Sequence, residues 1–199
     1  PTGPELTWSY GGKYRCRAGD RLSFSLAASD HSYTGHISYR FRKVPLKVLA
    51  GDFNARFGQG LALWNGMTMS GLSSPASFMK NPSGISESWS FKGTNAFTGI
   101  VAESDIGYFT CSAFAAFPDL KEGEKQTSIL PALSLSWNGR NIHVGLTHYA
   151  RFDNVFSLQP SYIPDMKSSA DISMCVKGMD LFAELVFGWI NVRPAALGG

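Results

Sequence analysis

Apolar and polar residues alternate with a period of two along most of the chain, which is the pattern of a β-strand with two different faces. In the first part of the chain the alternating runs cover residues 13–17, 22–28, 36–42 and 49–57. In the second part they cover 97–101, 108–116, 129–137, 142–152, 172–176 and 181–187. The pattern predicts an all-β chain of about ten strands, joined as successive antiparallel hairpins.

The segments between the runs differ in length. We predict tight turns at Gly19, at 103–105, at Asn138-Gly139 and at Lys177-Gly178. Asn138-Gly139 is the most specific of these, because a type I′ turn needs positive φ at both central residues. Longer segments with neither period cover 65–95, 118–127 and 154–167. Short turns on one rim and long loops on the other are typical of an outer-membrane β-barrel.

Strand length and aromatic residues favour the same class. Several runs are about 9–11 residues long, the length that a tilted strand needs to cross a bilayer. Aromatic residues lie close to the predicted strand ends, where a ring can sit at the membrane interface, for example Tyr39, Trp64, Tyr108, Trp137 and Trp189. We therefore expect a single domain over 1–199 that forms an up-and-down antiparallel transmembrane β-barrel, either complete or a large fragment of one.

Composition narrows the function classes without choosing among them. The net charge of +3 comes with no cluster of lysine or arginine, so nucleic-acid binding is not indicated. The mean hydropathy of −0.07 suits a soluble protein, and it also suits a membrane barrel whose inward residues are polar. The cysteines, Cys16, Cys111 and Cys175, are too far apart for a zinc ribbon or a redox pair. We expect no cofactor and no metal.

The polar face of the predicted strands holds the candidate functional residues. Asp52, Asn54, Arg56 and Arg40 are the expected lumen-lining residues of a barrel. On this interpretation Phe53 and its apolar neighbours face lipid. A soluble β-sandwich would turn the polar face to water instead, and period alone does not separate the two folds.

A distinctive motif follows the fourth run. It consists of Phe57, Gly58, Gln59, Gly60, Leu61 and, three positions on, Trp64. It is not a phosphate-binding loop, because it lacks the Gly-Lys-Ser/Thr ending and no helix is predicted after it. We expect its glycines to let the backbone bend at the rim of the barrel.

The motif and its surroundings carry a family resemblance. The block from Gly51-Asp52-Phe53 through Phe57 to Gly66 resembles the barrel region of Bacteroidetes outer-membrane proteins that carry helix-hairpin-helix repeats at their N-terminus. The likeness continues through Ser136-Trp137-Asn138-Gly139 and covers most of 45–199. It implies an antiparallel barrel in the outer membrane of a Gram-negative cell. The helix-hairpin-helix segment is absent here, so no DNA-binding role follows.

We therefore expect an outer-membrane barrel with a structural, porin-like or transport role and no catalytic activity. The bilayer is its expected partner, and segment 65–95 is the candidate for plugging the lumen or for contacting another outer-membrane or periplasmic protein. One alternative is a soluble β-sandwich or β-barrel binding module. The other is an outer-membrane barrel hydrolase, which would need Ser134 or Ser136 beside His143 or His148.

Overall fold

The chain is almost entirely β-structure in the computed structural model, which describes residues 10–30, 32–65, 80–89, 96–118, 128–153, 165–177 and 179–189. The strands are β1 (Gly11–Ala18), β2 (Leu22–Ser29), β3 (Tyr33–Arg40), β4 (Leu46–Arg56), β5 (Gly84–Glu87), β6 (Phe97–Ile106), β7 (Phe109–Ala116), β8 (Leu130–Asn138), β9 (Ile142–Arg151), β10 (Asp165–Val176) and β11 (Met179–Trp189). The all-β prediction is confirmed.

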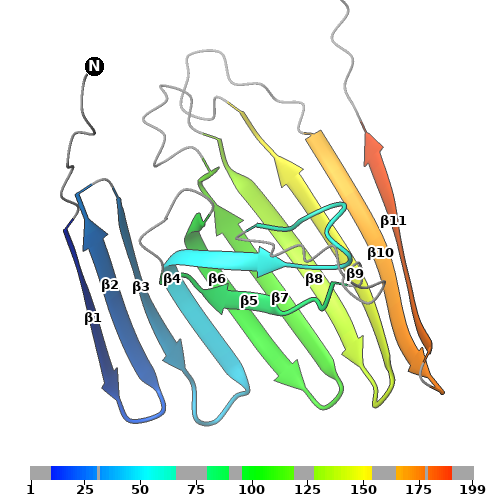
Figure 1. The fold of residues 1–199 in the computed structure, drawn as a ribbon, viewed down its shortest axis with the longest axis horizontal. Coiled ribbons are helices and arrows are strands. Elements are labelled where there is room, and N and C mark those ends of the chain that lie inside the picture. Colours follow the sequence, from blue (N-terminus) through cyan, green and yellow to red (C-terminus); the bar gives the residue numbers. More distant parts are fainter. Residues whose placement is uncertain are drawn as a thin grey trace, which may run out of the picture.

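Ten of these strands form one up-and-down wall. Their order in the sheet is β1-β2-β3-β4-β6-β7-β8-β9-β10-β11, with every neighbouring pair antiparallel, and β5 pairs only with β4. Figure 1 shows the wall strands side by side, with β1 and β11 at the two edges. The described part of the sheet is not closed, because β1 and β11 are the ends of the pairing order.

Two of the predicted tight turns are confirmed. Gly19, between β1 and β2, has φ of 61°, and Lys177, between β10 and β11, has φ of 51°. Val176 pairs with Met179, so only two residues connect these last strands. Both turns use the left-handed backbone region that brings a chain back on itself in few residues.

Two other turns differ from the prediction. Residues 103–105 belong to β6, and the chain reverses instead at Gly107, whose φ is 64°. The strand continues because the hydroxyls of Ser112 and Thr110 on β7 donate hydrogen bonds to Glu103 and Asp105, at 3.1 and 2.8 Å. A carboxylate with a cross-strand partner does not end a strand.

The Asn138-Gly139 turn is not a type I′ turn. Gly139 is not among the described residues with positive φ, and β9 begins only at Ile142. Asn138 pairs with His143, so four residues separate the last paired positions, and the Gly139 N–H donates to the Ile142 carbonyl at 2.8 Å. The hairpin itself was predicted correctly, but two more residues lie between its last paired positions than a type I′ turn has.

The segment 65–95 is not structureless throughout. Residues 66–79 and 90–95 lie outside the described residues, but 80–89 contains β5, which makes eleven strands rather than about ten. β10 also begins earlier than the periodicity indicated, at Asp165.

Strand β4 leaves the wall halfway along its length. Residues up to Gly51 pair with β3, whereas Phe53–Arg56 pair with β5 on that side. In Figure 1 the later part of β4, in cyan, and β5 run across the wall strands instead of along them. We call residues 52–65 and 80–89 together the crossing segment, and the side of the wall on which it lies the inner face.

The crossing segment encloses the hydrophobic core against the inner face. Phe53 is fully buried, and its ring lies 5.3 Å from that of Phe114 on β7, centroid to centroid. The rest of the core comes from both layers: Leu49, Ala55, Phe57, Leu63, Ile85, Val101, Ala116, Leu130 and Ala132. The core of the described residues thus lies inside the sheet's concavity.

The outer face of the wall carries exposed large apolar side chains. Examples are Phe24 on β2, Leu133 on β8, Leu146 on β9 and Phe187 on β11, of which the last two are 55% and 61% exposed. Inward neighbours such as Ser25, Ser134 and Thr147 are buried. The predicted alternation of apolar and polar positions is therefore real, with the apolar set uncovered.

Among the described residues, no helix is long and apolar enough to cross a membrane.

Candidate functional site

The bend in β4 depends on Gly51. Its φ is 111°, and a Cβ placed on it would lie 2.3 Å from the carbonyl oxygen of Gly35 on β3. An L-residue with a side chain is disfavoured at this φ and has no room at this contact. Glycine therefore allows the chain to leave the wall at this position.

Asp52 fixes the direction that the chain takes after the bend. Its side chain accepts a hydrogen bond from the Gly35 N–H at 2.8 Å and another from the Thr98 hydroxyl. Its carbonyl oxygen accepts a hydrogen bond from the Ser88 N–H at 3.0 Å. Only 3% of Asp52 is exposed, so these bonds compensate for taking a carboxylate out of water.

The other predicted lumen-lining residues separate into two groups. Asn54 and Arg56 lie on the crossing segment, where they pair with Ser86 and Gly84 of β5. Only Arg40, at the end of β3, belongs to the wall, and it lines a polar cavity of about 560 Å³ beside β1 and β2. The prediction placed all four along one wall, whereas three of them follow the bend.

The facing of the apolar residues in this run also needs correction. Phe53, Ala55 and Phe57 do share a face, as the alternation predicts, but they are buried in the core and do not face outward. Leu49, which is still paired within the wall, is buried in the same core, so this set of β4 residues already faces inward before the bend at Gly51. Periodicity reports which residues share a side and does not report what covers that side.

The Phe57–Trp64 motif follows directly on the end of β4, and it lies against the middle of β11. The carboxylate of Glu184 accepts hydrogen bonds from the backbone N–H groups of Gln59, Leu61 and Ala62, at 2.8, 3.0 and 3.3 Å. A carboxylate that receives several backbone N–H groups forms charge-assisted bonds, which are the strong ones. Glu184 thus fastens one end of the crossing segment to an edge strand.

The glycines, Gln59 and Trp64 of the motif each make a contact or adopt a backbone conformation that explains the residue type. Gly58 has φ of 62°, and a Cβ there would lie 2.7 Å from Glu184 Oε1; Gly60 has φ of 85°. The Gln59 side-chain amide donates to the Lys80 carbonyl at 3.0 Å and accepts from the Lys80 N–H at 2.9 Å. Leu61 is exposed, while the Trp64 ring lies 5.1 Å from the Lys80 ammonium. The motif therefore forms a compact turn that is hydrogen-bonded to Glu184 on β11 and to the backbone of Lys80.

The opposite end of the crossing segment contacts β1. The guanidinium of Arg15 lies 3.9 Å from the centroid of the Trp89 ring, and the Lys13 ammonium donates to the Trp89 carbonyl at 3.3 Å. Arg15 also donates to the hydroxyl of Ser25 on β2 at 3.1 Å. Such cation–π contacts are modest individually, but here two basic residues of one strand converge on one ring. The crossing segment thus reaches both edge strands of the wall.

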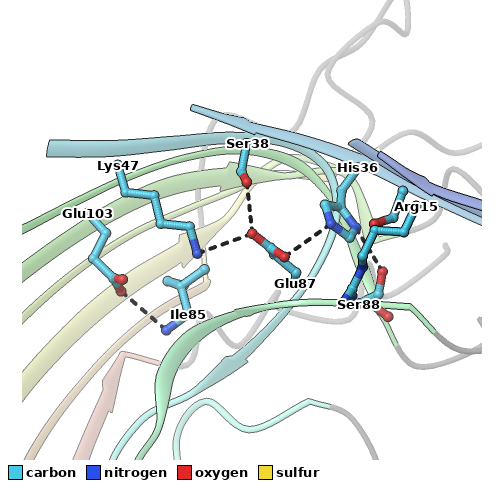
Figure 2. A network of polar contacts seen from close by, with 9 residues as sticks. Arg15, His36, Ser38, Lys47, Ile85, Glu87, Ser88 and Glu103 are labelled. Carbon is cyan, nitrogen blue, oxygen red and sulfur yellow. Dashed lines mark hydrogen bonds and ion pairs between the residues drawn. The ribbon is translucent and has the colours of Figure 1, made fainter. Parts of the chain in front are cut away.

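A polar network holds β5 between these two ends. Glu87 accepts a hydrogen bond from the Ser38 hydroxyl at 2.8 Å, and its carboxylate lies 3.3 Å from His36 Nε2 and 3.5 Å from the Lys47 ammonium. Figure 2 shows Glu87 pointing into this group, with the Ile85 N–H directed to Glu103 beside it. Every wall partner of Glu87 comes from β3 or β4.

The charge state of Glu87 follows from these contacts. Burial alone raises the pKa of Glu87, but the hydrogen bond from Ser38 and the charges of Lys47 and His36 outweigh it and hold that pKa below the ordinary glutamate value. Glu87 is therefore ionised at neutral pH and acts as an acceptor for β3 and β4.

Three of the four residues that the hydrolase alternative names make other contacts, whereas Ser136 lines the same cavity as His143. The Ser134 hydroxyl lies 3.1 Å from that of Thr147, and His143 Nδ1 lies 2.7 Å from Asn138 Oδ1. His148 Nδ1 lies 2.8 Å from the hydroxyl of Ser168 on β10. His143 and His148 are on opposite faces, as their spacing predicts.

The sequence indicated Glu184 as an inward residue of the last strand, but it did not single out the other acidic residues that organise the inner face, namely Glu87, Glu103 and Asp171. A carboxylate within an otherwise apolar strand was the available signal, because such a residue needs a partner when it is turned inward. No group of three or more described His, Cys, Asp or Glu residues is placed to hold a metal ion, and the three cysteines are exposed and form no disulfide.

The chain matches no protein-family model, no curated protein and no solved structure.

Proposed function

We propose that this chain forms the wall of an outer-membrane β-barrel whose lumen is occupied by its own crossing segment, with a structural or transport role and no catalytic activity. The observation that carries the proposal is the inside-out distribution of side chains. Large apolar residues are exposed on the outer face, while the inner face holds buried serines, threonines and carboxylates beside the hydrophobic core under the crossing segment. An exposed apolar surface of this extent marks contact with lipid or with another apolar surface.

The topology supports closure. Ten wall strands alternate in direction, so β1 and β11 run antiparallel and have the relative orientation that an up-and-down barrel needs. Barrels of about eight strands have room only for their own side chains, and larger ones enclose space. A ten-stranded wall is therefore suited to hold one crossing segment, and β5 with the Phe57–Trp64 motif fills that role.

Fractionation and heat modifiability test the membrane assignment. We expect the full-length protein to need detergent for extraction from cell envelopes. We also expect it to run faster on gels when unheated, because a closed barrel resists unfolding by the detergent. Extraction in plain buffer, together with identical mobility before and after heating, would reject the barrel and favour the soluble binding module.

Conductance in planar bilayers tests the role of the crossing segment. A variant in which residues 57–89 are replaced by a short Gly/Ser linker should conduct ions better than the wild type, because the obstruction is removed. The matched control shortens the β3–β4 connection at 41–45, which lies at the opposite end of β4 from the crossing segment. Equal conductance of the wild type and the linker variant would contradict a plug.

A further inference from the structure

A second polar cavity lies under the crossing segment, on the inner face over β6 to β10 and away from Arg40. Its volume is about 200 Å³, and Phe57, Gly58 and residues 82–84 of the crossing segment form one side of it. The other side is formed by inward residues of β6 to β10.

Cross-strand pairing explains why these wall residues come together. One row runs through Asp171, Gly145, Ser136, Thr110 and Asp105, each paired with the next. The adjacent row runs through Thr147, Ser134, Ser112 and Glu103. Every residue of both rows lines the cavity. The wall of the cavity is therefore made of hydroxyl groups with carboxylates at both ends.

Acidic side chains outnumber basic ones in the described lining of the cavity. Its described lining contains three carboxylates, from Glu103, Asp105 and Asp171, and His143 is the one basic residue in it. Several of the hydroxyls are already engaged, since Ser112 and Thr110 donate to Glu103 and Asp105. An acceptor-rich cavity of this kind suits a ligand that is positively charged and donates hydrogen bonds.

Asp171 is the buried carboxylate of this cavity. Its side chain is 1% exposed, and neither carboxylate oxygen has a hydrogen bond to any residue that the structure describes. The facing residue on β9 is Gly145, where a Cβ would lie 2.2 Å from Asp171 Oδ1. Glycine thus clears the space into which this buried carboxylate extends. A buried charge left in this way is costly unless a cation or donor meets it.

The neighbours of Asp171 do not complete its hydrogen bonding. Glu184, its partner on β11, is itself a carboxylate and is occupied by the crossing segment. His143 Nε2 lies 3.3 Å from Asp171 Oδ2, and His143 Nδ1 lies 2.7 Å from Asn138 Oδ1. The imidazole is an ion-pair partner of Asp171 only when it is protonated, because a neutral imidazole that donates from Nδ1 has only a lone pair at Nε2. At a pH where histidine is neutral, a donor placed beside the two groups serves both.

We infer that this cavity binds a small primary ammonium ion, with the ammonium group at Asp171 and His143 and the alkyl part toward Phe57. An ammonium carries three donors and one positive charge, which matches the acceptors on the wall. A volume of about 200 Å³ corresponds to roughly six waters of liquid, enough for a cation of about five non-hydrogen atoms. The inference concerns the cavity alone and does not depend on whether the wall spans a membrane.

Calorimetric titration of the folded chain with n-butylammonium tests the proposed ammonium site. The protein is kept in detergent if its extraction needs detergent, and in plain buffer otherwise. The titration is run at about pH 8, where an ordinary histidine is neutral. We expect saturable binding of n-butylammonium, no binding of 1-butanol at the same concentrations, and no competition from potassium chloride. Equal binding of 1-butanol, full competition by potassium, or no binding of n-butylammonium would each overturn the inference with the wild-type protein alone.

Two variants then locate the site. Asp171→Asn keeps the size of the side chain and should weaken binding by at least about tenfold, as expected for the loss of one charge from a buried pair. Asp180→Asn removes a carboxylate from the neighbouring strand outside the cavity and should leave binding unchanged. Equal weakening by both variants would mean that the overall negative charge of this region attracts the cation, and it would contradict a site at Asp171.

Discussion

At the scale of single residues, two positions determine whether the crossing segment can exist. Gly51 allows β4 to leave the wall, and Glu184 receives the segment at the other side of the inner face. Neither acts through apolar burial. One is required by backbone geometry and the other by hydrogen bonding to three backbone N–H groups.

Replacing Gly51 tests the bend. Gly51→Ala should lower the free energy of unfolding by on the order of 3 kcal/mol, because it adds backbone strain at φ of 111° and a clash with the Gly35 carbonyl. Urea titration measures the change. Gly12→Ala is the control, since a Cβ there meets nothing within 4 Å and needs no unusual φ. Similar losses in both variants would contradict a special role for Gly51.

Replacing Glu184 tests the anchor. Glu184→Gln keeps the side-chain length but removes the charge and one acceptor oxygen, so we expect a loss of about 1–3 kcal/mol in unfolding free energy. Limited proteolysis should also cut within 57–64 more readily. Asp180→Asn on the same strand is the matched control. Unchanged protection of 57–64 in Glu184→Gln would show that the anchor is not needed.

At the scale of elements, the sequence predicted the wall strands better than the crossing segment. The runs at 22–28 and 142–152 alternate cleanly because each strand has one covered and one uncovered face. β5 has only four residues, too few for a period to be recognised, and its partners on β3 and β4 are distant in sequence. Likewise, the motif at 57–64 was recognisable, but its contact with Glu184 depends on tertiary structure.

The docking of β5 should depend on pH through Glu87. Its pKa in the folded chain is below the ordinary glutamate value, so its contribution to stability is complete above that ordinary value and is lost as the pH falls through the folded-state pKa. The difference in urea midpoint between the wild type and Glu87→Gln should therefore be largest near neutral pH and vanish in strong acid. If the difference in urea midpoint grew on acidification, it would contradict a stabilising role of ionised Glu87.

At the scale of the whole molecule, alternation, strand length and up-and-down order were readable from the chain, whereas closure was not. Alternation requires only that the two faces of a strand differ. It does not show whether lipid, a second sheet or a lumen lies against each face. The Asn138-Gly139 hairpin shows the same limit locally: the pairing was predictable, but the loop geometry depended on the register of β8 and β9.

A charge on the outer face tests what that face contacts. Leu146→Arg should lower the stability of the protein folded into phospholipid vesicles by about 2–4 kcal/mol, the cost of an arginine near the middle of a bilayer. Tyr108→Arg, in the β6–β7 turn, should cost about 0–1 kcal/mol, because the proposed barrel places this turn at the membrane interface. Equal costs at the two positions would contradict a lipid-facing band.

The anchoring of the crossing segment to Glu184 also constrains the order of folding. The bond between Gln59 and Glu184 joins residues 125 positions apart, so it cannot form until β11 has been synthesised and placed. Contacts of such long range form late, because closing a large loop costs entropy before it brings any gain. During biogenesis the segment must therefore wait, unanchored on this side, while the wall is built. The arrival of β11 then completes the wall and fastens the segment in a single step.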